Sequence, residues 1–307
     1  MKLNALLKTL GFLALAATPV VAGTTAPAPK NPISPAPEND DLGITASIGY
    51  DTNYVWRGLN IGQHWVRSAI DGTILLVGGA GEDGAGTTSL NWDVQYGSLA
   101  DDQDHFAVNN LFSFQRLQLG AAIEHDLGPV SVSLGYRYFR NMGDLANPPG
   151  VGAFGVGMQD GQEVSLGLGT TLGPINVATS ANYDYVNDSW YFDFDANTVI
   201  AVTDSISVVP FFNVGYGKNL NWQANGANFA GFLNGAQADD VTGWTAIATG
   251  IRVPIKLNSR ATLTPYIAAN LPLGTTENIA GSARAAGLPD TPFKSVLFGG
   301  VTLSVRF

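Results

Sequence analysis

Apolar and polar residues alternate along most of the chain, most clearly at its C-terminal end. Within residues 295–307, every second residue from Phe307 back to Leu297 is apolar or glycine, and the positions between are mostly small or polar. A period of two is typical of a β-strand, because successive side chains point to opposite faces. A soluble sheet rarely leaves such an edge unpaired, since it promotes aggregation. In a transmembrane β-barrel the apolar face meets lipid and the polar face lines the lumen.

The alternation predicts twelve strands, and their connections differ in length. Connections after odd-numbered strands fall near residues 58–63, 99–107, 141–161, 187–189, 218–240 and 273–293, and turns after even-numbered strands fall near 78–86, 127–129, 172–174, 203–204 and 257–260. The three longest connections all follow odd strands. Short periplasmic turns and long outer loops are typical of outer-membrane barrels, whereas a soluble sandwich has no reason to sort its loops. We therefore predict an all-β fold, a single transmembrane antiparallel β-barrel of about 12 strands over residues 43–307.

The first 42 residues carry export and spacer signals. Two lysines precede an apolar run over residues 10–17, and Ala22 offers a small residue for cleavage. These features predict a signal peptide over residues 1–22, and the run is too short to span a bilayer as a helix. Residues 23–42 contain five prolines, which favour an extended chain. We expect this Pro-rich segment to be a periplasmic linker.

Composition narrows the classes of partner. The chain has no cysteine, a formal net charge of −10 and only 13% charged residues. The absence of cysteine excludes disulfides and thiolate metal sites, and the acidic balance argues against nucleic acid as a partner. The aromatic C-terminal residue, Phe307, resembles the C-terminal signature by which the barrel-assembly machinery recognises bacterial outer-membrane proteins. We expect a bacterial outer-membrane location, with membrane lipid, the assembly machinery and small solutes or ions as partners.

Aromatic residues gather at the strand ends nearest the long connections. An amphipathic ring suits the lipid–water interface, so these residues predict an outer aromatic girdle. The alternative is a set of core aromatics in a soluble sandwich, which their clustering at one end of the strands disfavours. The predicted girdle comprises Tyr54, Trp56, Tyr136, Tyr138, Tyr183, Tyr185, Trp190 and Tyr216.

The segment Tyr54-Val55-Trp56-Arg57-Gly58 ends the first predicted strand. It is similar to a tyrosine–aromatic–arginine–glycine signature found in the TorF-type family of bacterial outer-membrane porins. Leu59 and Asn60 follow the glycine here, where the family pattern has isoleucine and serine. The resemblance implies a porin-like outer-membrane barrel and leaves the solute undefined.

Charged residues at predicted inward positions are the candidates for pore lining. A charged side chain that faces lipid costs roughly 2–4 kcal/mol near mid-bilayer, so these side chains should point inward. We expect Arg137 at a height similar to that of Asp193 and Asp195. The candidates are Asp51, Arg57, Arg67, Asp93, Arg137, Glu163, Asp184, Asp193, Asp195, Arg252 and Arg306.

Two functions remain open for such a lumen. The first is a porin-like channel for passive diffusion of ions or small solutes. The second is a structural or adhesive barrel whose lumen is closed by ion pairs. A ring of twelve strands lies between the roughly 8 strands whose interior side chains can fill and the roughly 16 of an open porin, so strand number does not decide.

A hydrolase would need a nucleophile, a base and an orienting group on one face. The histidines are His64, His105 and His125, and Glu124 next to His125 would face the opposite way along a strand. The chain has no Gly-X-Ser-X-Gly segment. We therefore expect no enzyme activity, no catalytic residue, no cofactor and no metal site.

Overall fold

The structure is a computed structural model that describes residues 42–78, 86–100, 114–142, 160–220, 241–274 and 295–307. The predicted signal peptide, all but the last residue of the predicted linker, and most of the long outer connections lie outside these residues. Within the ranges that the structure describes, no helix is long and apolar enough to cross a membrane.

Strands joined by turns make up the described chain. Two of them, β9 and β12, contain only two residues each and follow β8 and β11 closely. The strands are β1 (Ile44–Trp56), β2 (Leu59–Val77), β3 (Thr88–Leu99), β4 (Gln115–Asp126), β5 (Val130–Met142), β6 (Gly161–Leu172), β7 (Ile175–Asp184), β8 (Ser189–Thr198), β9 (Ile200–Ala201), β10 (Ser207–Leu220), β11 (Val241–Arg252), β12 (Ile255–Lys256), β13 (Ala261–Pro272) and β14 (Val296–Arg306).

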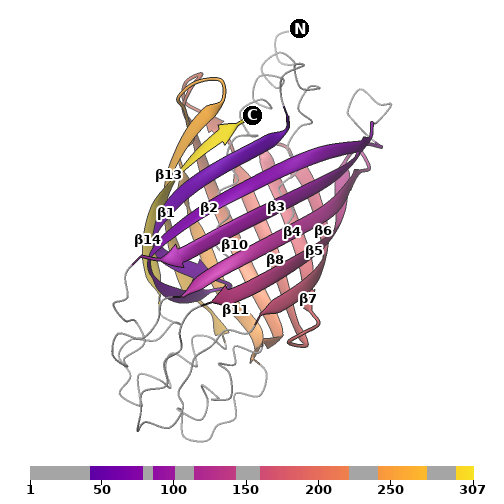
Figure 1. Ribbon diagram of the computed structural model, residues 1–307, viewed down its shortest axis with the longest axis vertical. Coiled ribbons are helices and arrows are strands. Elements are labelled where there is room, and N and C mark those ends of the chain that lie inside the picture. Colours follow the sequence, from indigo (N-terminus) through magenta and orange to yellow (C-terminus); the bar gives the residue numbers. More distant parts are fainter. Residues whose placement is uncertain (1–41, 79–85, 101–113, 143–159, 221–240, 275–294) are drawn as a thin grey trace, which may run out of the picture.

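The twelve long strands close into a ring. Each long strand pairs antiparallel with the next long strand in sequence, from β1 through to β14. Strand β14 then pairs with β1, in register from Thr45–Arg306 to Asp51–Gly300. Figure 1 shows the tilted strands wrapped around a single barrel. The predicted twelve-stranded antiparallel β-barrel is confirmed.

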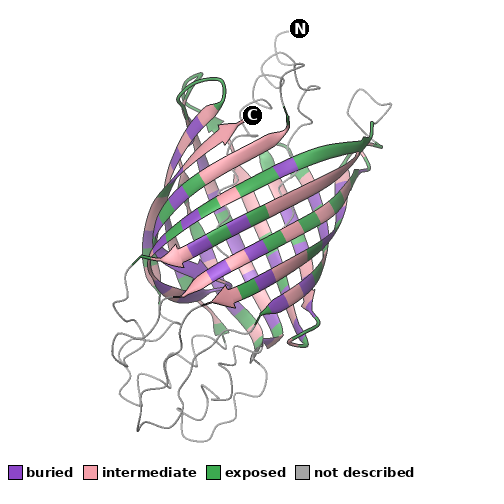
Figure 2. Cartoon of the chain, viewed as in Figure 1, coloured by how far each residue is buried: buried purple, intermediate pink, exposed green. Residues whose placement is uncertain are grey.

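Large apolar side chains cover the outside of the barrel. Ile70, Leu134 and Leu166 are 48%, 59% and 53% exposed, whereas Ser133, next to Leu134, is only 9% exposed. Figure 2 shows this alternation of exposed and buried residues along the strands. An apolar outer face on a closed barrel matches the hydrocarbon core of a bilayer, so the chain is a transmembrane barrel of the bacterial outer membrane.

Short turns close the end of the barrel that carries the C-terminus. The Leu127 N–H donates to the carbonyl of Val130 at 2.9 Å, between β4 and β5. At the same end, the Leu42 N–H donates to the carbonyl of Phe307 at 2.7 Å. In the predicted topology this is the periplasmic end, and β1 runs outward from it.

Cysteine labelling tests this topology, because the chain contains no natural cysteine. Single cysteines at Gly150, Gly226 and Gly281, in connections outside the described residues, should react with an impermeant maleimide on intact cells. A cysteine at Gly128, in the turn between β4 and β5, should react only after the outer membrane is permeabilised. Reaction of the Gly128 variant alone would invert the topology, and equal reaction of all four would contradict a membrane-spanning barrel.

Candidate functional site in the barrel lumen

A hairpin that leaves the barrel wall crosses the outer end of the lumen. Strand β1 pairs with β14 only as far as Asp51–Gly300, although β14 continues outward, paired with β13. Strand β2 begins to pair with β3 at Trp65–Leu99. The ladder pairs of residues 52–64 join the two arms of this segment to each other. We call residues 52–64 the inward hairpin.

Backbone geometry explains the sharp tip of the inward hairpin. Arg57 and Gly58 join its two arms, with φ of 51° and 86°. Positive φ at both central residues is typical of a type I′ turn, whose twist suits a two-residue hairpin. The ladder shifts between the pairs Tyr54–Gly62 and Val55–Asn60, which leaves Ile61 as the extra residue of a bulge in the second arm. Tyr54 and Val55 are neighbours in the first arm and point to opposite faces of the hairpin, and both are buried because both faces lie inside the barrel.

The tip contacts strands on the far side of the lumen. Arg57 Nη2 lies 2.5 Å from Oε1 of Glu163 on β6, which is five strands from β1 around the ring. Asn270 Nδ2 on β13 donates to the carbonyl of Gly58 at 2.9 Å. A Cβ added to Gly58 would lie 2.7 Å from the Cβ of Ala246 on β11, so glycine permits the close approach of the tip to this strand. The hairpin therefore bridges the lumen.

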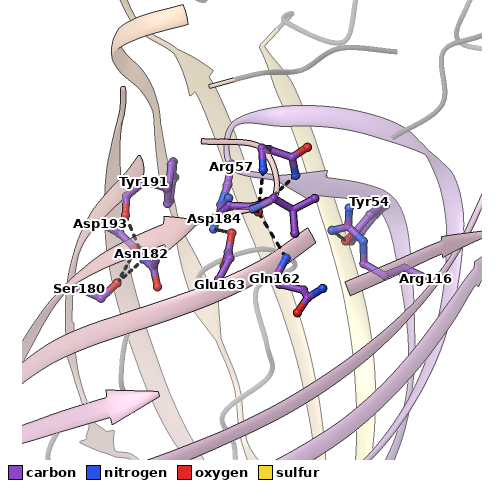
Figure 3. Close-up of polar contacts among 12 residues, drawn as sticks. Tyr54, Arg57, Arg116, Gln162, Glu163, Ser180, Asn182, Asp184, Tyr191 and Asp193 are labelled. Atoms are coloured by element: carbon purple, nitrogen blue, oxygen red, sulfur yellow. Dashed lines mark hydrogen bonds and ion pairs between the residues drawn. The ribbon is translucent and has the colours of Figure 1, made fainter. Parts of the chain in front are cut away.

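Arg57 is the charged centre of the tip. The Arg57 and Glu163 side chains are only 3% and 2% exposed, and the Arg57 guanidinium lies 4.7 Å from the ring centroid of Trp56 and 4.5 Å from that of Tyr191. A desolvated cation gains from such ring contacts as well as from its carboxylate. Figure 3 shows Arg57 beside Glu163, with Tyr191 nearby.

A second arginine lies in an aromatic cage beside the tip. Arg116 on β4 donates from Nη1 to the Tyr54 hydroxyl at 2.8 Å and from Nε to Asn141 Oδ1 at 2.7 Å. Its guanidinium lies 4.5–5.7 Å from the ring centroids of Trp56, Phe139, Phe114 and Tyr54. Two of these rings belong to the hairpin, so the cage fastens the hairpin to the wall.

Apolar packing fills the lumen on the other side of the hairpin. Val55 belongs to one buried cluster with Phe211, Ala268 and Phe298, and Tyr266 packs against this cluster. The partners of Val55 come from β10, β13 and β14. Burial of each large apolar side chain contributes roughly 1.5–3 kcal/mol, which stabilises the inward position.

These contacts correct two of the predicted girdle residues. Tyr54 is 3% exposed and stacks on Trp65 with ring centroids 4.1 Å apart. The ring of Trp56 packs edge-on against that of Phe139, with ring centroids 6.3 Å apart. The guanidinium groups of Arg57 and Arg116 also contact the Trp56 ring. The girdle assignment of Tyr54 and Trp56 is therefore wrong, because the hairpin carries both rings into the lumen.

The remaining six predicted girdle residues lie on the outer face. Tyr183, Trp190 and Tyr216 belong to an aromatic ladder with centroid spacings of 4.7–6.3 Å, completed by Phe192 and Trp244. The hydroxyls of Tyr136 and Tyr185 both donate to Gln162 Oε1, and Tyr138 approaches Asp160. Their role at the lipid interface stays a prediction.

The wall formed by β6, β7 and β8 is acidic. Residues 161–204 contain no lysine or arginine. Asp193 accepts hydrogen bonds from Ser180 Oγ at 2.6 Å and from Asn182 Nδ2 at 3.1 Å, and Figure 3 shows this group beside Tyr191. Asp195 accepts from Asn213 Nδ2 at 3.0 Å. The hydrogen bonds hold these carboxylates in place on the lumen side.

Asp184 has a local structural role on the same wall. Its Oδ1 accepts from the backbone N–H groups of Val186 and Asn187, at 3.0 and 3.2 Å. Oδ2 accepts from Asn187 Nδ2 at 2.6 Å. These bonds order the turn between β7 and β8 at the outer end.

An ion pair lies where β1 meets β14 and the hairpin departs. Arg67 Nε donates to Asp51 Oδ2 at 3.0 Å, and both side chains are at least 95% buried. Arg67 Nη2 also donates to Thr302 Oγ1, and the Tyr266 hydroxyl donates to Asp51 Oδ1, each at 2.8 Å. Strands β1, β2, β13 and β14 are thus joined by one polar network.

Arg137 meets Asp93 rather than the acidic wall. Its Nη2 lies 3.6 Å from Asp93 Oδ1, and the side chains are 24% and 28% exposed. Gly120 on β4 lies between Asp93 and Arg137 in the sheet. A Cβ added to Gly120 would collide with the Asp93 carboxylate. Arg137, which was expected at a height similar to that of Asp193 and Asp195, therefore forms its ion pair with Asp93, across β3–β5.

The last two predicted lumen residues lie on β11 and β14. Arg252 places its guanidinium 4.2 Å from the ring centroid of Phe211, inside the barrel. Arg306 pairs with Thr45 near the periplasmic end, on the face of β14 that carries Thr302. Both side chains are half-buried.

Burial of the inward residues changes along the barrel axis. Near the hairpin, Asn182 and Asn270 are each 1% exposed. Toward the periplasmic end, Asp71 is exposed, and Asn197 and Arg306 are half-buried. Ser131 and Thr262, also toward the periplasmic end, are 2% and 5% exposed, so burial is mixed there, whereas the lumen is packed where the hairpin crosses it.

The described histidines lie far from each other along the strands. His64 Nδ1 is 2.6 Å from the Tyr50 hydroxyl at the outer end, and His125 Nδ1 is 2.9 Å from Thr88 Oγ1 near the periplasmic end. His105 lies outside the described residues. Within the described ranges, no three His, Cys, Asp or Glu residues are grouped to hold a metal ion.

Comparisons with known proteins return similar barrel shapes with little shared sequence. No family model matches the chain, and no curated protein matches it. The KdgM porin is 6% identical, with 86% of this chain and 99% of that chain covered at a TM-score of 0.44. An outer membrane channel from Pseudomonas putida F1 is 9% identical, with 89% of this chain and 100% of that chain covered at a TM-score of 0.48. LpxR from Salmonella typhimurium is 8% identical, with 86% of this chain and 100% of that chain covered at a TM-score of 0.48. Membership of the TorF-type family stays a prediction.

Proposed function

We propose that this barrel is a porin-like channel for passive diffusion of ions or small solutes. The observation that supports this proposal most strongly is the polar lumen, in which an acidic wall on β6–β8 faces a hairpin that presents Arg57. Fixed charges of opposite sign inside a low-dielectric barrel act on passing ions, as they do in selective pores.

A closed structural or adhesive barrel is the second candidate. The packed hairpin and the buried Arg57–Glu163 and Asp51–Arg67 pairs favour it. Conductance separates the two candidates, because a permanently closed lumen carries no current. Purified protein in a planar bilayer should give discrete single-channel steps, and their complete absence would favour the structural barrel.

Neutralising the acidic wall should change ion preference. In Asp193→Asn/Asp195→Asn, two fixed negative charges are lost, so we expect the cation-to-anion permeability ratio to fall on the order of threefold. Reversal potential in a salt gradient measures this ratio. Asp204→Asn, in the turn before β10, is the matched control and should leave the ratio unchanged. A double variant with lowered heat stability and an unchanged ratio would contradict the proposal.

A further inference from the structure

We propose that the inward hairpin is a gate, and that its Arg57 masks a cation path along the acidic wall. This inference rests on the channel function proposed above. At rest, the tip occupies the lumen and neutralises Glu163. When the tip withdraws, Glu163, Asp193 and Asp195 line one side of the lumen, where residues 161–204 contain no lysine or arginine and Arg252 on β11 is the cation that acts on Asp195.

The hairpin is built so that it can move without opening the wall. Its ladder pairs join its own arms, so displacement leaves the pairs of β1 with β14 up to Asp51 and of β2 with β3 from Trp65 intact. His64, where the second arm rejoins the wall, has φ of 55°. A non-glycine residue in the left-handed region is a strained position of the kind found at switch segments.

The contacts between hairpin and wall are incompletely satisfied. Trp56 Nε1, Glu163 Oε2 and Asn270 Oδ1 are buried and have no hydrogen-bond partner in the described part of the chain. Buried polar groups without partners destabilise the state that buries them. The Arg57–Glu163 pair and the Arg116 cage oppose this cost. Arg57 and Arg116 therefore hold the resting position together with the apolar packing of Val55, and Arg57 supplies the ion pair at the tip itself.

A reversible cross-link tests whether the hairpin moves. The Cβ positions of Gly58 and Ala246 are 2.7 Å apart, so a shift of about 1 Å brings them to disulfide distance. In Gly58→Cys/Ala246→Cys, oxidation should abolish channel openings and reductant should restore them. Gly58→Cys alone is the control for strain at that position and should not respond to reductant. Equal conductance before and after reduction, with the disulfide confirmed by mass spectrometry, would overturn the gate.

Two charge variants test what the gate masks. Arg57→Asn tolerates positive φ and removes the cation, whereas Glu163→Gln removes its partner and keeps Arg57. Each breaks a buried pair, so open probability should rise about tenfold or more in both. Only Arg57→Asn should also raise the cation-to-anion permeability ratio, whereas Glu163→Gln should lower it. Equal ratios in the two variants would assign Arg57 a purely structural role.

The outcomes also separate the gate from the channel itself. Steady wild-type conductance that neither the cross-link nor Arg57→Asn alters would leave the channel standing and remove the gate. Absence of current in the wild type, the reduced cross-link variant and Arg57→Asn, all verified as folded by heat modification, would remove the channel together with the gate.

Discussion

Deletion of Phe307 should reduce the amount of folded barrel in the membrane by about tenfold or more, while the signal peptide is still cleaved. The Phe307 N–H donates to the carbonyl of Ile44 at 2.9 Å, and its own carbonyl accepts from Leu42 at 2.7 Å. These bonds close the seam between the last strand and the first at the periplasmic rim. Two hydrogen bonds are together worth about 2 kcal/mol, and the deletion also removes the aromatic ring that the assembly machinery is expected to recognise. Heat-modifiable protein in outer-membrane fractions is the measurement.

Two substitutions separate the ring from the backbone bonds. Phe307→Ala keeps both seam hydrogen bonds and loses the ring, whereas Phe307→Tyr keeps both features. If recognition of the ring dominates, Phe307→Ala should fail as the deletion does, and Phe307→Tyr should insert normally. Wild-type amounts of folded barrel from the deletion would show that neither feature is needed.

The strands were predictable because each one has a lipid face and a lumen face. β5 begins at Val130 and β13 at Ala261, where the alternation resumes after short turns with glycine, proline or asparagine. The loop asymmetry also set the direction of the strands, because the short turns gather at one end. Alternation and the lengths of the connections were therefore enough to predict most of the strands and their order.

The inward hairpin was not predictable by the same rule, because it has no lipid face. Residues 58–63 were expected to be a connection, yet β2 begins at Leu59 and the turn contains only Arg57 and Gly58. Alternation placed Tyr54 outward, but β1 leaves the wall after Asp51, so Tyr54 lies inside the barrel. The available signal was the Arg-Gly pair directly between two strand segments, which suits a type I′ turn.

The lumen contacts depend on which strands face each other across the barrel. The alternation of the sequence placed Asp51, Arg67 and Glu163 on the inner face. It does not show which inward residues face each other across the lumen. Arg57 therefore could not be matched to Glu163, nor Arg137 to Asp93. Tyr191 was missed because it lies between two outward aromatics, although the same alternation puts it inside.

Loss of Asp51 should be among the most destabilising single changes in the wall. Asp51→Ala leaves the Arg67 guanidinium, 4% exposed, without its carboxylate, and leaves the Tyr266 hydroxyl without its acceptor. Removing one partner of a buried pair costs about 3–5 kcal/mol. We expect the free energy of unfolding, measured by urea titration in lipid vesicles, to fall by that amount.

A matched pair and a double variant sharpen this expectation. Asp93→Ala breaks the Asp93–Arg137 pair, whose side chains are about a quarter exposed, so the cost should stay near 1 kcal/mol or below. Asp51→Ala/Arg67→Met removes both buried charges and should recover part of the stability lost in Asp51→Ala, because no uncompensated cation remains. Equal losses for Asp51→Ala and Asp93→Ala would mean that burial does not set the strength of these pairs. A double variant no more stable than Asp51→Ala would mean that packing around Arg67, rather than its charge, stabilises the seam.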